Sequence, residues 1–516
     1  MDAAQITSIT DVETLHGIVI DQLTAIAARD AKIAADHRAI VYKDSKIEAL
    51  TAEVYRLRRV HYAARTERMD PDQRVLFDEA LTADIAAVEA ELDALRSPQA
   101  EAARVRDKPK RQPLPASLPR IETRHEPASC ACAQCGAALV QIGEHVSEKL
   151  DVKPLEFFVR REVYPQYACR GCQTVTAEPV APTIVDRGLA APGLIAQVAI
   201  SKYVDHLPLY RQEAIYARSG VEIGRTSMAE WLGAAGVALQ PLVAAMRSEL
   251  LAHPVLHADE TPVAMLDPGA GKTRRAYLFA YRTATSDPMV VFDFCISRGG
   301  RHAKNFLGDY RGALMVDDYA GYKALFAEGI TELGCWAHAR RKFVDLHKAS
   351  GSQIAQQAIN KIATLYQIEA KARDLDDGAR QAYRQCHAAP LVHDLKTWLD
   401  AIRPTVVGNS GTANAIDYTL KRWPALARYL DDGRYPIDNN PIENAIRPIA
   451  LGRKNWLFAG SEPAGKRAAA IMSLLATAKA NGHEPHAWLT DVLTRLPTTL
   501  DRDIDTLLPH HWRPAG

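Results

Sequence analysis

The chain contains 516 residues, of which 47% are hydrophobic, and its 63 basic side chains nearly balance its 62 acidic ones. One hydrophobic core rarely supports a chain of this length, so we expect about three or four domains. The near-neutral charge excludes a global electrostatic preference for nucleic acid or for an anionic membrane surface. Any such preference must therefore reside in local segments.

Cysteine usage and hydropathy indicate the cellular compartment. Four of the eight cysteines stand in two Cys-x-x-Cys pairs, which is typical of metal binding in a reducing compartment and not of a disulfide framework. The first residues lack the basic and apolar regions of a signal peptide, and no uninterrupted apolar run reaches about 18 residues. We therefore expect a soluble, cytoplasmic protein that does not span a membrane.

A seven-residue apolar repeat marks the region over residues 1–97. Its members are Val19, Ile26, Ile33, Ile40, Ile47 and Val54, joined by Leu50 and Leu57 in the second half. The repeat predicts a coiled-coil seam and hence a homo-oligomer. Polar residues at the intervening positions Arg29, Asp36 and Lys43 would weaken the early heptads, so an intramolecular helical hairpin is the alternative. A second amphipathic helix is predicted over residues 72–96.

The composition changes over residues 98–128, where Pro, Arg and Lys dominate the stretch "RVRDKPKRQPLPASLPR". Such a composition predicts an extended basic linker without a packed element. A solvated tether is the simplest interpretation. Beside a DNA-binding module, the same linker would add contacts to phosphates.

Two cysteine pairs define a small module over residues 129–186. Cys132 and Cys135 form the first pair, and Cys169 and Cys172 form the second. Four thiolates in two such pairs match a tetrahedral structural Zn²⁺ site, with a short β-hairpin expected between the pairs. Cys130 leaves the register of the first pair open. Buried free thiols are the alternative, but they do not explain the repeated pairing.

Residues 192–250 predict three or more helices within a region over residues 187–252. The piece "RSGVEIGRTSMAEWL" has a glycine-containing turn before a helix that begins near Thr226, which is the outline of a helix-turn-helix. Arg225, Thr226 and Ser227 would be the exposed candidates for DNA contact. Ordinary helical hairpins share this outline, so a purely structural role is equally compatible.

Strand-like runs dominate the start of the next region, over residues 253–460. They are "PVLHADETPVAML", "RRAYLFAYRT", "PMVVFDFCIS" and "GALMVDDYAGY", followed by a helix, the strand "ITELGCW" and another helix. The order β-β-β-α-β-α-β-α predicts a ribonuclease H-like mixed sheet. A helical insertion is expected over about 351–435, and a helical C-terminal segment over residues 461–516. The fold class is thus multidomain α+β.

Two aspartates are expected on adjacent strands of that sheet. Asp259 lies on the first strand, and Asp317 lies at the end of the fourth. Hard cations such as Mg²⁺ prefer oxygen ligands, and two ions held about 3.5–4 Å apart by carboxylates can promote reaction at a phosphodiester. Acids at strand ends are often merely solvated, and the neighbouring acids Glu260, Asp293 and Asp318 could be mistaken for the ligands.

Five motifs carry a resemblance to a known family. They are "HADETPV", "DDYAGY", "CWAHARRKF", "IDNNPIENAIRP" and "WLFAGS", and the tail contains "TAKANGHEPHAWLTDVLTRLP". In this order they resemble the motifs of the insertion sequence 66 family of transposases. The resemblance spans nearly the whole chain, and it implies an Asp-Asp-Glu triad at Asp259, Asp317 and Glu443 with Mg²⁺ or Mn²⁺ as the catalytic metal.

The resemblance also implies partners and further residues. The DNA partners would be the terminal inverted repeats of a bacterial insertion sequence and its target DNA, and such elements typically carry two small accessory proteins. The pair Cys335 and His338 resembles a Cys-x-x-His signature that follows the second acid in transposases of this type. Its alternatives are a buried cysteine and a locally hydrogen-bonded histidine. Asp318 stands where the family commonly has Gly, so it is the alternative second acid.

Cations near these motifs are candidates for DNA contact. Arg340, Arg341 and Lys342 are adjacent, and three adjacent cations cannot all be buried, so contacts to phosphates are expected. Arg447 follows Glu443 by four residues and joins this group as a candidate.

A structural interpretation of Glu443 also exists. With Asn440 as the N-cap and Pro441 in the first helical position, Glu443 would be third and could reach back to the cap. Arg447 would offer it a second structural partner. Two aspartates that lack a third ligand favour the metal-binding interpretation.

Two glycine-rich stretches resemble phosphate-binding loops. In "GSEPAGKR", residues 460–467, Arg467 replaces the Ser or Thr that would bind Mg²⁺, and in "PGAGKT", residues 268–273, the first Gly is missing. We expect turns at both places and no bound nucleotide.

The leading hypothesis from sequence is an active DNA transposase that cleaves strands at the element ends and transfers them to target DNA. A catalytically inactive, transposase-derived DNA-binding regulator is the main alternative, because it would keep the zinc and helical modules. A ribonuclease H-like host nuclease is a third possibility, but it would not explain the coiled coil and the family-like tail.

Overall fold

The structure is a computed structural model, and it describes most of the chain from residue 114 onward. Its described residues are 114–514, apart from 115, 117, 127–128, 132–133, 154–155, 186–187 and 268–269, together with 82, 84–92 and separate positions between 16 and 57. The chain divides into two compact units, one of residues 1–62 and 88–109 and the other of residues 63–87 and 110–516.

The described residues of the smaller unit are helical. Its early heptads expose their apolar residues, since Ile26, Ile33 and Ile40 are 48%, 65% and 56% exposed, whereas Val54 and Leu57 are buried. Val19, the first member of the repeat, lies outside the described residues. Pairing of two such helices in a coiled coil stays a prediction.

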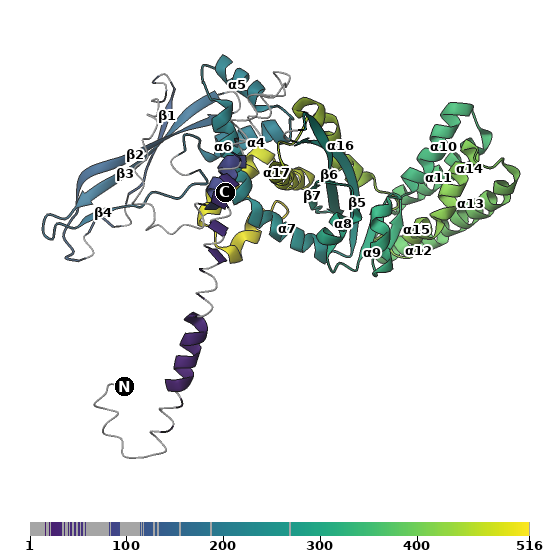
Figure 1. Cartoon of the computed structure of the whole chain (residues 1–516), viewed down its shortest axis with the longest axis horizontal. Helices are drawn as coiled ribbons and strands as arrows, with labels where there is room; N and C mark the ends of the chain where they lie inside the picture. Colours follow the sequence, from purple (N-terminus) through teal and green to yellow (C-terminus); the bar gives the residue numbers. More distant parts are fainter. Residues whose placement is uncertain are drawn as a thin grey trace. The chain divides into compact units, whose positions relative to one another are not determined.

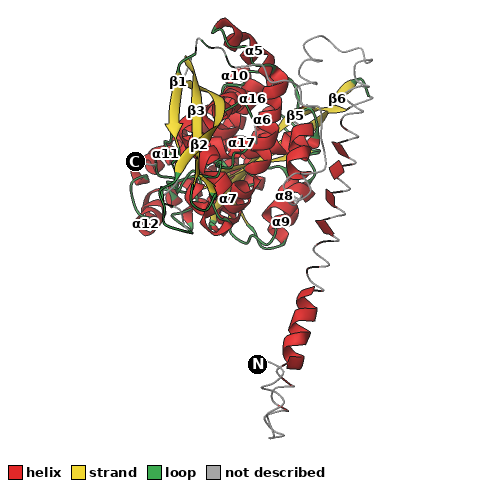
Figure 2. Cartoon of the chain, turned by 90° about the vertical axis from the view of Figure 1, so that its left-hand side faces the viewer, coloured by secondary structure: helices red, strands yellow, loops and turns green. Residues whose placement is uncertain are grey.

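The larger unit begins with a small sheet in which β3 is central. Its strands are β1 (Arg120–Arg124), β2 (Val140–Lys153), β3 (Glu156–Ala168) and β4 (Val175–Ala177). β2 and β4 pair with β3 antiparallel, and β1 pairs with it parallel. Figure 2 shows β1, β3 and β2 as neighbouring yellow strands.

This sheet corrects two expectations. Residues 120–124 were expected in an unpacked linker, but they form β1 because their backbone groups pair with the edge of β3. The hairpin between the cysteine pairs is not short, because β2 and β3 contain 14 and 13 residues. The earlier part of the linker, residues 98–113, lies outside the described residues.

Four helices follow the small sheet. They are α4 (Pro192–Tyr203), α5 (Leu209–Arg218), α6 (Arg225–Ala238) and α7 (Gln240–Ala252). Apolar side chains such as Leu194 and Met228 bury α4 and α6 in the largest core of the protein. Gly220, at φ +78°, ends α5 in a left-handed conformation that favours glycine. α6 starts at Arg225, next to the predicted start near Thr226.

The central sheet has five strands in the order β7-β6-β5-β8-β9. The strands are β5 (Val255–Asp267), β6 (Lys272–Thr283), β7 (Val290–Cys295), β8 (Ala313–Val316) and β9 (Thr331–Gly334). β5, β6 and β7 are antiparallel neighbours, whereas β8 and β9 run parallel to β5. The intervening helices are α8 (Gly300–Leu307), η3 (Ala320–Tyr322) and α9 (Lys323–Ala327). This chain order is the one predicted from the strand-like runs.

Helices cover both faces of the central sheet. On one face, Ala258 and Leu314 share a core with Phe306 of α8 and with helices α4 to α7. On the other face, apolar residues of β5, β6 and β7 pack against α16 (Asn440–Trp456) and α17 (Glu462–Ala480). α17 also satisfies backbone groups of β7, because Ser473 accepts from the N–H of Phe292 at 2.8 Å. A covered strand edge is protected from pairing with other chains.

A separate helical group lies between β9 and α16 in the sequence. It contains α10 (Trp336–Ser350), α11 (Gln353–Ala372), α12 (Asp377–His387), α13 (Ala389–Ile402), η4 (Arg403–Thr405), α14 (Gly411–Lys421), α15 (Trp423–Ala427) and η5 (Arg428–Leu430). Figure 1 shows α10 to α15 as one green cluster of helices. Its own core includes Trp336, whose indole donates to the carbonyl of Leu426 at 2.9 Å.

The C-terminal helices correct the expected turn at residues 460–467. Ser461 caps α17 by accepting from the N–H of Ala464 at 3.1 Å, and Arg467 within that helix forms a buried ion pair with Asp84. The segment is therefore a helix start. α18 (Pro485–Arg495), η6 (Leu496–Thr498) and η7 (Asp501–Leu507) complete the fold.

Within the described residues, hydropathy gives no single helix that would cross a membrane. Only α6 and α7 taken together reach the required length and composition, and that pair is bent by 44°.

Candidate active site

Strand register brings Asp259 and Asp317 to the same level of the central sheet. β5 and β8 are parallel, with His257 opposite Met315, so the residues two positions further along, Asp259 and Asp317, follow in the same register. Side chains alternate between the faces of a strand, so both aspartates belong to the face opposite that of Ala258. α16 packs against this face of β5.

Asn439 fixes the start of α16 against β5. Its side-chain amide donates to the carbonyl of Ala258 at 2.9 Å, and its Oδ1 lies 2.9 Å from Nδ1 of His257. Asn439 is fully buried. Because Asp259 follows Ala258 and Glu443 lies in the first turn of α16, these contacts hold the two acids near one another.

The helix start differs by one residue from the predicted cap. Asn439, and not Asn440, is the N-cap, and it makes no side-chain capping bond. Asn440 is the first helical residue, and its side-chain amide donates to Asp438 at 2.7 Å. Glu443 therefore sits one position later than the capping interpretation requires, and its carboxylate contacts other residues.

The environment of Asp259 disfavours its charged form. Burial raises the pKa of this carboxyl group to about 8, and the negative charges of Glu260, Asp317 and Glu443 contribute further. Two of these charges, Asp317 and Glu443, are the other predicted acids of the triad. Like charges gathered without a cation are unstable, and this arrangement is typical of sites that bind cations.

The neighbouring acids have structural partners. Glu260 pairs with Arg298 at 2.5 Å and accepts from the hydroxyl of Tyr322 at 3.3 Å. Asp318 pairs with Lys323 at 3.3 Å and with Arg422 at 3.4 Å. Their charges are therefore compensated by the fold.

The contacts of Asp317 are different from those of Asp318. Its Oδ1 accepts from the backbone N–H of Tyr319 at 2.7 Å, while Arg422 donates to its backbone carbonyl, also at 2.7 Å. These bonds fix the chain just after β8 without pairing the Asp317 carboxylate with a cation among the described residues.

Residues of α10 surround the carboxylate of Glu443. Arg341 Nη2 lies 3.3 Å from Oε2 of Glu443, and His338 Nδ1 lies 3.5 Å from Oε1. Cys335, His338 and Glu443 place their ligand atoms within 4.8 Å of one another. The predicted Cys-x-x-His pair thus lies beside the third acid, and the described ion pairs of Glu443 involve α10 and not Arg447.

The predicted DNA-binding cations occupy different surroundings. Arg340 and Arg341 line a hollow of about 690 Å³ together with Lys348 and Asn440, next to Glu443. Lys342 instead lies over the ring of Tyr418, 5.2 Å from its centroid. Three cations and one acid, Asp345, line this hollow, so its charge is mainly positive and suits phosphates.

The other DNA-binding candidates lie in the first turn of α6 and in the middle of α16. Thr226 is exposed, whereas Arg225 and Ser227 are half-buried in the first turn of α6. The backbone N–H of Arg225 donates to Glu213 at 3.2 Å, which ties α6 to α5. Arg447 is exposed on α16.

Three of the predicted zinc ligands converge in the small module. Cys135 Sγ lies 3.5 Å from Cys169 Sγ and 3.8 Å from Cys172 Sγ. A tetrahedron with Zn–S bonds of about 2.3 Å has edges of about 3.8 Å, so these separations fit a shared Zn²⁺ ion. Cys132 lies outside the described residues. Cys130 is described, and it is not part of this group.

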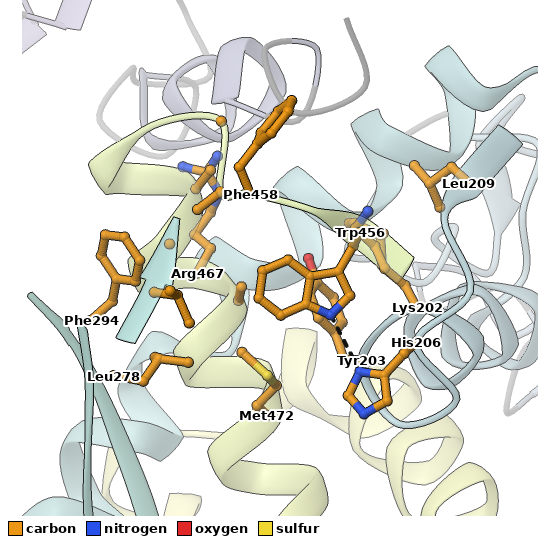
Figure 3. A pocket seen from close by; sticks show the side chains of 17 residues that line it. Lys202, Tyr203, His206, Leu209, Leu278, Phe294, Trp456, Phe458, Arg467 and Met472 are labelled. Atoms are coloured by element: carbon orange, nitrogen blue, oxygen red, sulfur yellow. Dashed lines mark hydrogen bonds between the residues drawn. The ribbon is translucent and has the colours of Figure 1, made fainter. Parts of the chain in front are cut away.

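An apolar cavity of about 90 Å³ lies away from the acids, between α4, α16 and α17 (Figure 3). Trp456 and Met472 line it, and the indole of Trp456 donates to His206 Nδ1 at 3.4 Å. Burial lowers the pKa of His206, which favours the neutral ring. The described lining contains no carboxylate, so the cavity lacks the ligands of a cation site.

Sequence reasoning missed the residues that position the acids. Asn439 and Arg422 act through contacts with chain segments more than 100 residues away, and no local pattern encodes such contacts. The only signal was the polar stretch "DNNP", which marked a helix start but not its attachment to β5. The ion pair of Arg341 with Glu443 was missed for the same reason.

The fold is that of a multidomain α+β protein, with acidic residues on neighbouring strands and on a helix packed against them. Comparison with known protein families gives matches along most of the chain. Residues 187–467 match the family described as Transposase IS66 family, residues 473–510 its C-terminal element, residues 129–173 the zinc-finger binding domain of transposase IS66, and residues 49–123 Transposase C of IS166 homeodomain.

Relatives with full-length similarity occur in Sinorhizobium fredii (strain NBRC 101917 / NGR234). The uncharacterized protein y4qI is 38% identical over 98% of this chain and 97% of its own length. The uncharacterized protein y4jD is 36% identical over 90% of this chain and 94% of its own length. This chain belongs to the IS66 family of transposases. Membership supports a transposase role, DNA as a partner and structural zinc in the small module.

Proposed function

We propose that this protein is a DNA transposase that cleaves strands at the ends of an insertion sequence and joins them to target DNA. The observation that carries the proposal is geometric: the pairing of β5 with β8 puts Asp259 and Asp317 in one register, and Asn439 attaches the start of the helix of Glu443 to Ala258. These acids come from β5, from the end of β8 and from α16 of the five-stranded mixed sheet, which we interpret as a ribonuclease H-like domain.

The three acids suit Mg²⁺ or Mn²⁺. All their donor atoms are carboxylate oxygens, which these hard cations prefer. Oε1 of Glu443 is buried without a hydrogen-bond partner among the described residues, and Asp259 resists ionisation. A bound cation would give Oε1 of Glu443 a partner and would stabilise the charged form of Asp259. When bound, two such ions would supply activation of a water or a 3′ hydroxyl and stabilisation of the leaving oxygen of a phosphodiester.

Residues of the chain would hold the cations, position the helices and bind the DNA backbone. Asp259, Asp317 and Glu443 would hold the ions, with Asn439 keeping α16 at the required distance from β5. Arg340, Arg341 and Lys348 would attract the DNA backbone along the hollow beside Glu443. Arg341 would leave Glu443 when cations bind, because the carboxylate then gains stronger partners and the guanidinium becomes available to a phosphate.

We assign the other segments as follows. Residues 1–97 would form oligomers, residues 98–128 would be a tether, and residues 129–186 would bind zinc. Residues 187–252 would recognise the DNA ends, residues 253–460 would carry out catalysis, and residues 461–516 would support the fold at the C-terminus. Exposed isoleucines such as Ile33 support a second copy as the partner of the coiled coil. Two small accessory proteins of the same element would complete the assembly.

The test is a reaction with linear DNA that carries the terminal inverted repeats of the element. With Mg²⁺, the protein should produce nicks with free 3′ hydroxyls at the repeat ends and then products joined to a target plasmid. With a chelator present, the DNA should be bound but not cut. Binding without cutting under both conditions would instead indicate a DNA-binding regulator.

A further inference from the structure

A second cluster of metal-binding residue types lies between α7 and the C-terminal tail. Glu249 belongs to the last turns of α7, and His510 and His511 follow η7. Their ligand atoms lie within 4.8 Å of one another. None of these residues belongs to the carboxylate site or to the cysteine module.

One carboxylate oxygen lies at the centre of the cluster. Glu249 Oε2 is 2.6 Å from Nε2 of His510 and 3.7 Å from Nε2 of His511. The first separation is a hydrogen bond, but the second exceeds the reach of one. The hydrogen bond holds His510, whereas His511 lies close enough to Glu249 for an ion pair when its ring is protonated, or for a shared metal ion.

The other ring nitrogen of His511 indicates its role. Nδ1 lies 3.3 Å from the carbonyl oxygen of Asp505, and a carbonyl can only accept, so the proton of the neutral ring is on Nδ1. In that neutral ring, Nε2 directs a lone pair toward the carboxylate of Glu249. A cation between the two atoms, either a proton or a metal ion, stabilises this arrangement. Metal-binding histidines commonly have their second nitrogen held by a backbone carbonyl in this way.

The geometry of His510 supports the same role. Its ring centroid lies 4.2 Å from that of His511, and its Nδ1 is buried without a hydrogen-bond partner among the described residues. Metals bind the neutral imidazole ring. His253 directly follows the end of α7, the helix that carries Glu249.

We propose that Glu249, His510 and His511 bind a divalent transition metal such as Zn²⁺. Two imidazoles and one carboxylate are a common three-ligand set for zinc, and a water or His253 would occupy the fourth position. A tetrahedron with bonds of about 2.0–2.1 Å has edges of about 3.3 Å. The separations of 2.6 and 3.7 Å bracket that edge, so shifts of less than about 1 Å would form the site.

The metal would fasten the C-terminal tail to α7. The tail already packs there through Leu507 and Leu508, which are fully buried, and α7 leads directly into β5. A metal across this contact would thus stabilise the support of the strand that carries Asp259. It would remain bound independently of the catalytic cations.

The test counts zinc on the full-length protein. Wild type should carry two Zn²⁺ per chain, one at the cysteines and one at this cluster. His511→Ala and Glu249→Gln should each carry one, and zinc affinity at the cluster should fall at least about tenfold. His393→Ala, an exposed histidine of α13, should keep both ions. His511 is 48% exposed, so its replacement should not disturb folding.

Substitution with Co²⁺ separates the two sites. The cysteine site gives thiolate charge-transfer absorption, whereas a site of imidazoles and carboxylate gives only weak ligand-field bands. We expect the weak bands to vanish in His511→Ala while the charge-transfer bands remain. Equal zinc content in wild type and His511→Ala, with unchanged cobalt spectra, would overturn the proposal.

Discussion

The side chain of Asn439 donates a hydrogen bond of 2.9 Å to the backbone carbonyl of Ala258. The two residues are 181 positions apart in the sequence, yet each lies beside an acid of the proposed site. Together with the contact between Asn439 and His257, this bond joins the strand of Asp259 to the start of the helix of Glu443. The separation of the two carboxylates therefore depends in part on Asn439.

Replacing Asn439 with alanine should weaken both folding and catalysis. The variant loses the bond to Ala258 and the contact with His257, which are buried, and this should cost about 2–4 kcal/mol of unfolding free energy. A shift of α16 by about 1 Å should slow strand transfer by about a hundredfold. Unfolding temperature and single-turnover strand transfer measure the two effects.

Asn414→Ala is the matched control for this variant. Asn414 is exposed on α14, so strand transfer should stay within a few-fold of wild type. Normal strand transfer by Asn439→Ala would show that other contacts position Glu443.

Removing the charge of Asp259 should stabilise the metal-free protein at high pH. The pKa of this carboxyl group is about 8 in the folded protein and 3.8 in its ordinary state, so the folded chain retains a proton that the unfolded chain loses. The contribution of this group to stability is complete below pH 3.8 and is lost as pH rises toward about 8. The unfolding temperature of Asp259→Asn should therefore exceed that of wild type increasingly over this range.

Two controls accompany the measurement on Asp259→Asn. Asp287→Asn changes an exposed acid and should follow the wild-type pH profile. Addition of Mn²⁺ should raise the unfolding temperature of wild type but not of Asp259→Asn. An advantage of Asp259→Asn that is the same at every pH would contradict the assigned environment of this acid.

The second acid of the triad should be Asp317 and not Asp318. Asp317→Asn should lower strand transfer by at least about a thousandfold, because a carboxylate that holds the catalytic cations supplies several kcal/mol. Asp318 is engaged with Lys323 and Arg422, so Asp318→Asn should lower stability by about 1 kcal/mol or less and retain transfer. Loss of strand transfer in Asp318→Asn, with transfer retained in Asp317→Asn, would show that Asp318 is the second acid.

Single cysteine variants should fix the register of the zinc module. Cys132→Ser, Cys135→Ser and Cys172→Ser should each lose one Zn²⁺ per chain, because a tetrahedral site needs all four thiolates. Cys130→Ser and Cys386→Ser should keep the ion, as both residues are exposed and outside the described cysteine group. Loss of zinc from Cys130→Ser would show that Cys130 is a ligand.

The sequence predicted those parts of the fold that depend on local pattern. The strand-like runs around Asp259 and Asp317 became β5 and β8, and the helix start before Glu443 was wrong by one residue only. Strand alternation and a capping signature are both written in a few neighbouring residues. The family motifs then linked three acids that spacing alone could not select.

Long-range contacts account for what the sequence did not predict. Residues 120–124 resemble a linker in composition. They form hydrogen bonds with the edge of β3, which no local sequence pattern predicts. Arg467 resembled part of a phosphate-binding loop and instead pairs with Asp84. Tertiary pairing of this kind overrides local composition.

Strand transfer by Glu443→Gln tests the central claim most directly. The control is Glu462→Gln, which alters a glutamate in the first turn of the neighbouring helix α17 whose partner is Lys466. On DNA with the element's inverted repeats and Mg²⁺, wild type and Glu462→Gln should yield joined products at similar rates, and Glu443→Gln should bind the DNA but yield none. Strand transfer by Glu443→Gln at the wild-type rate would contradict the assignment of the acidic site.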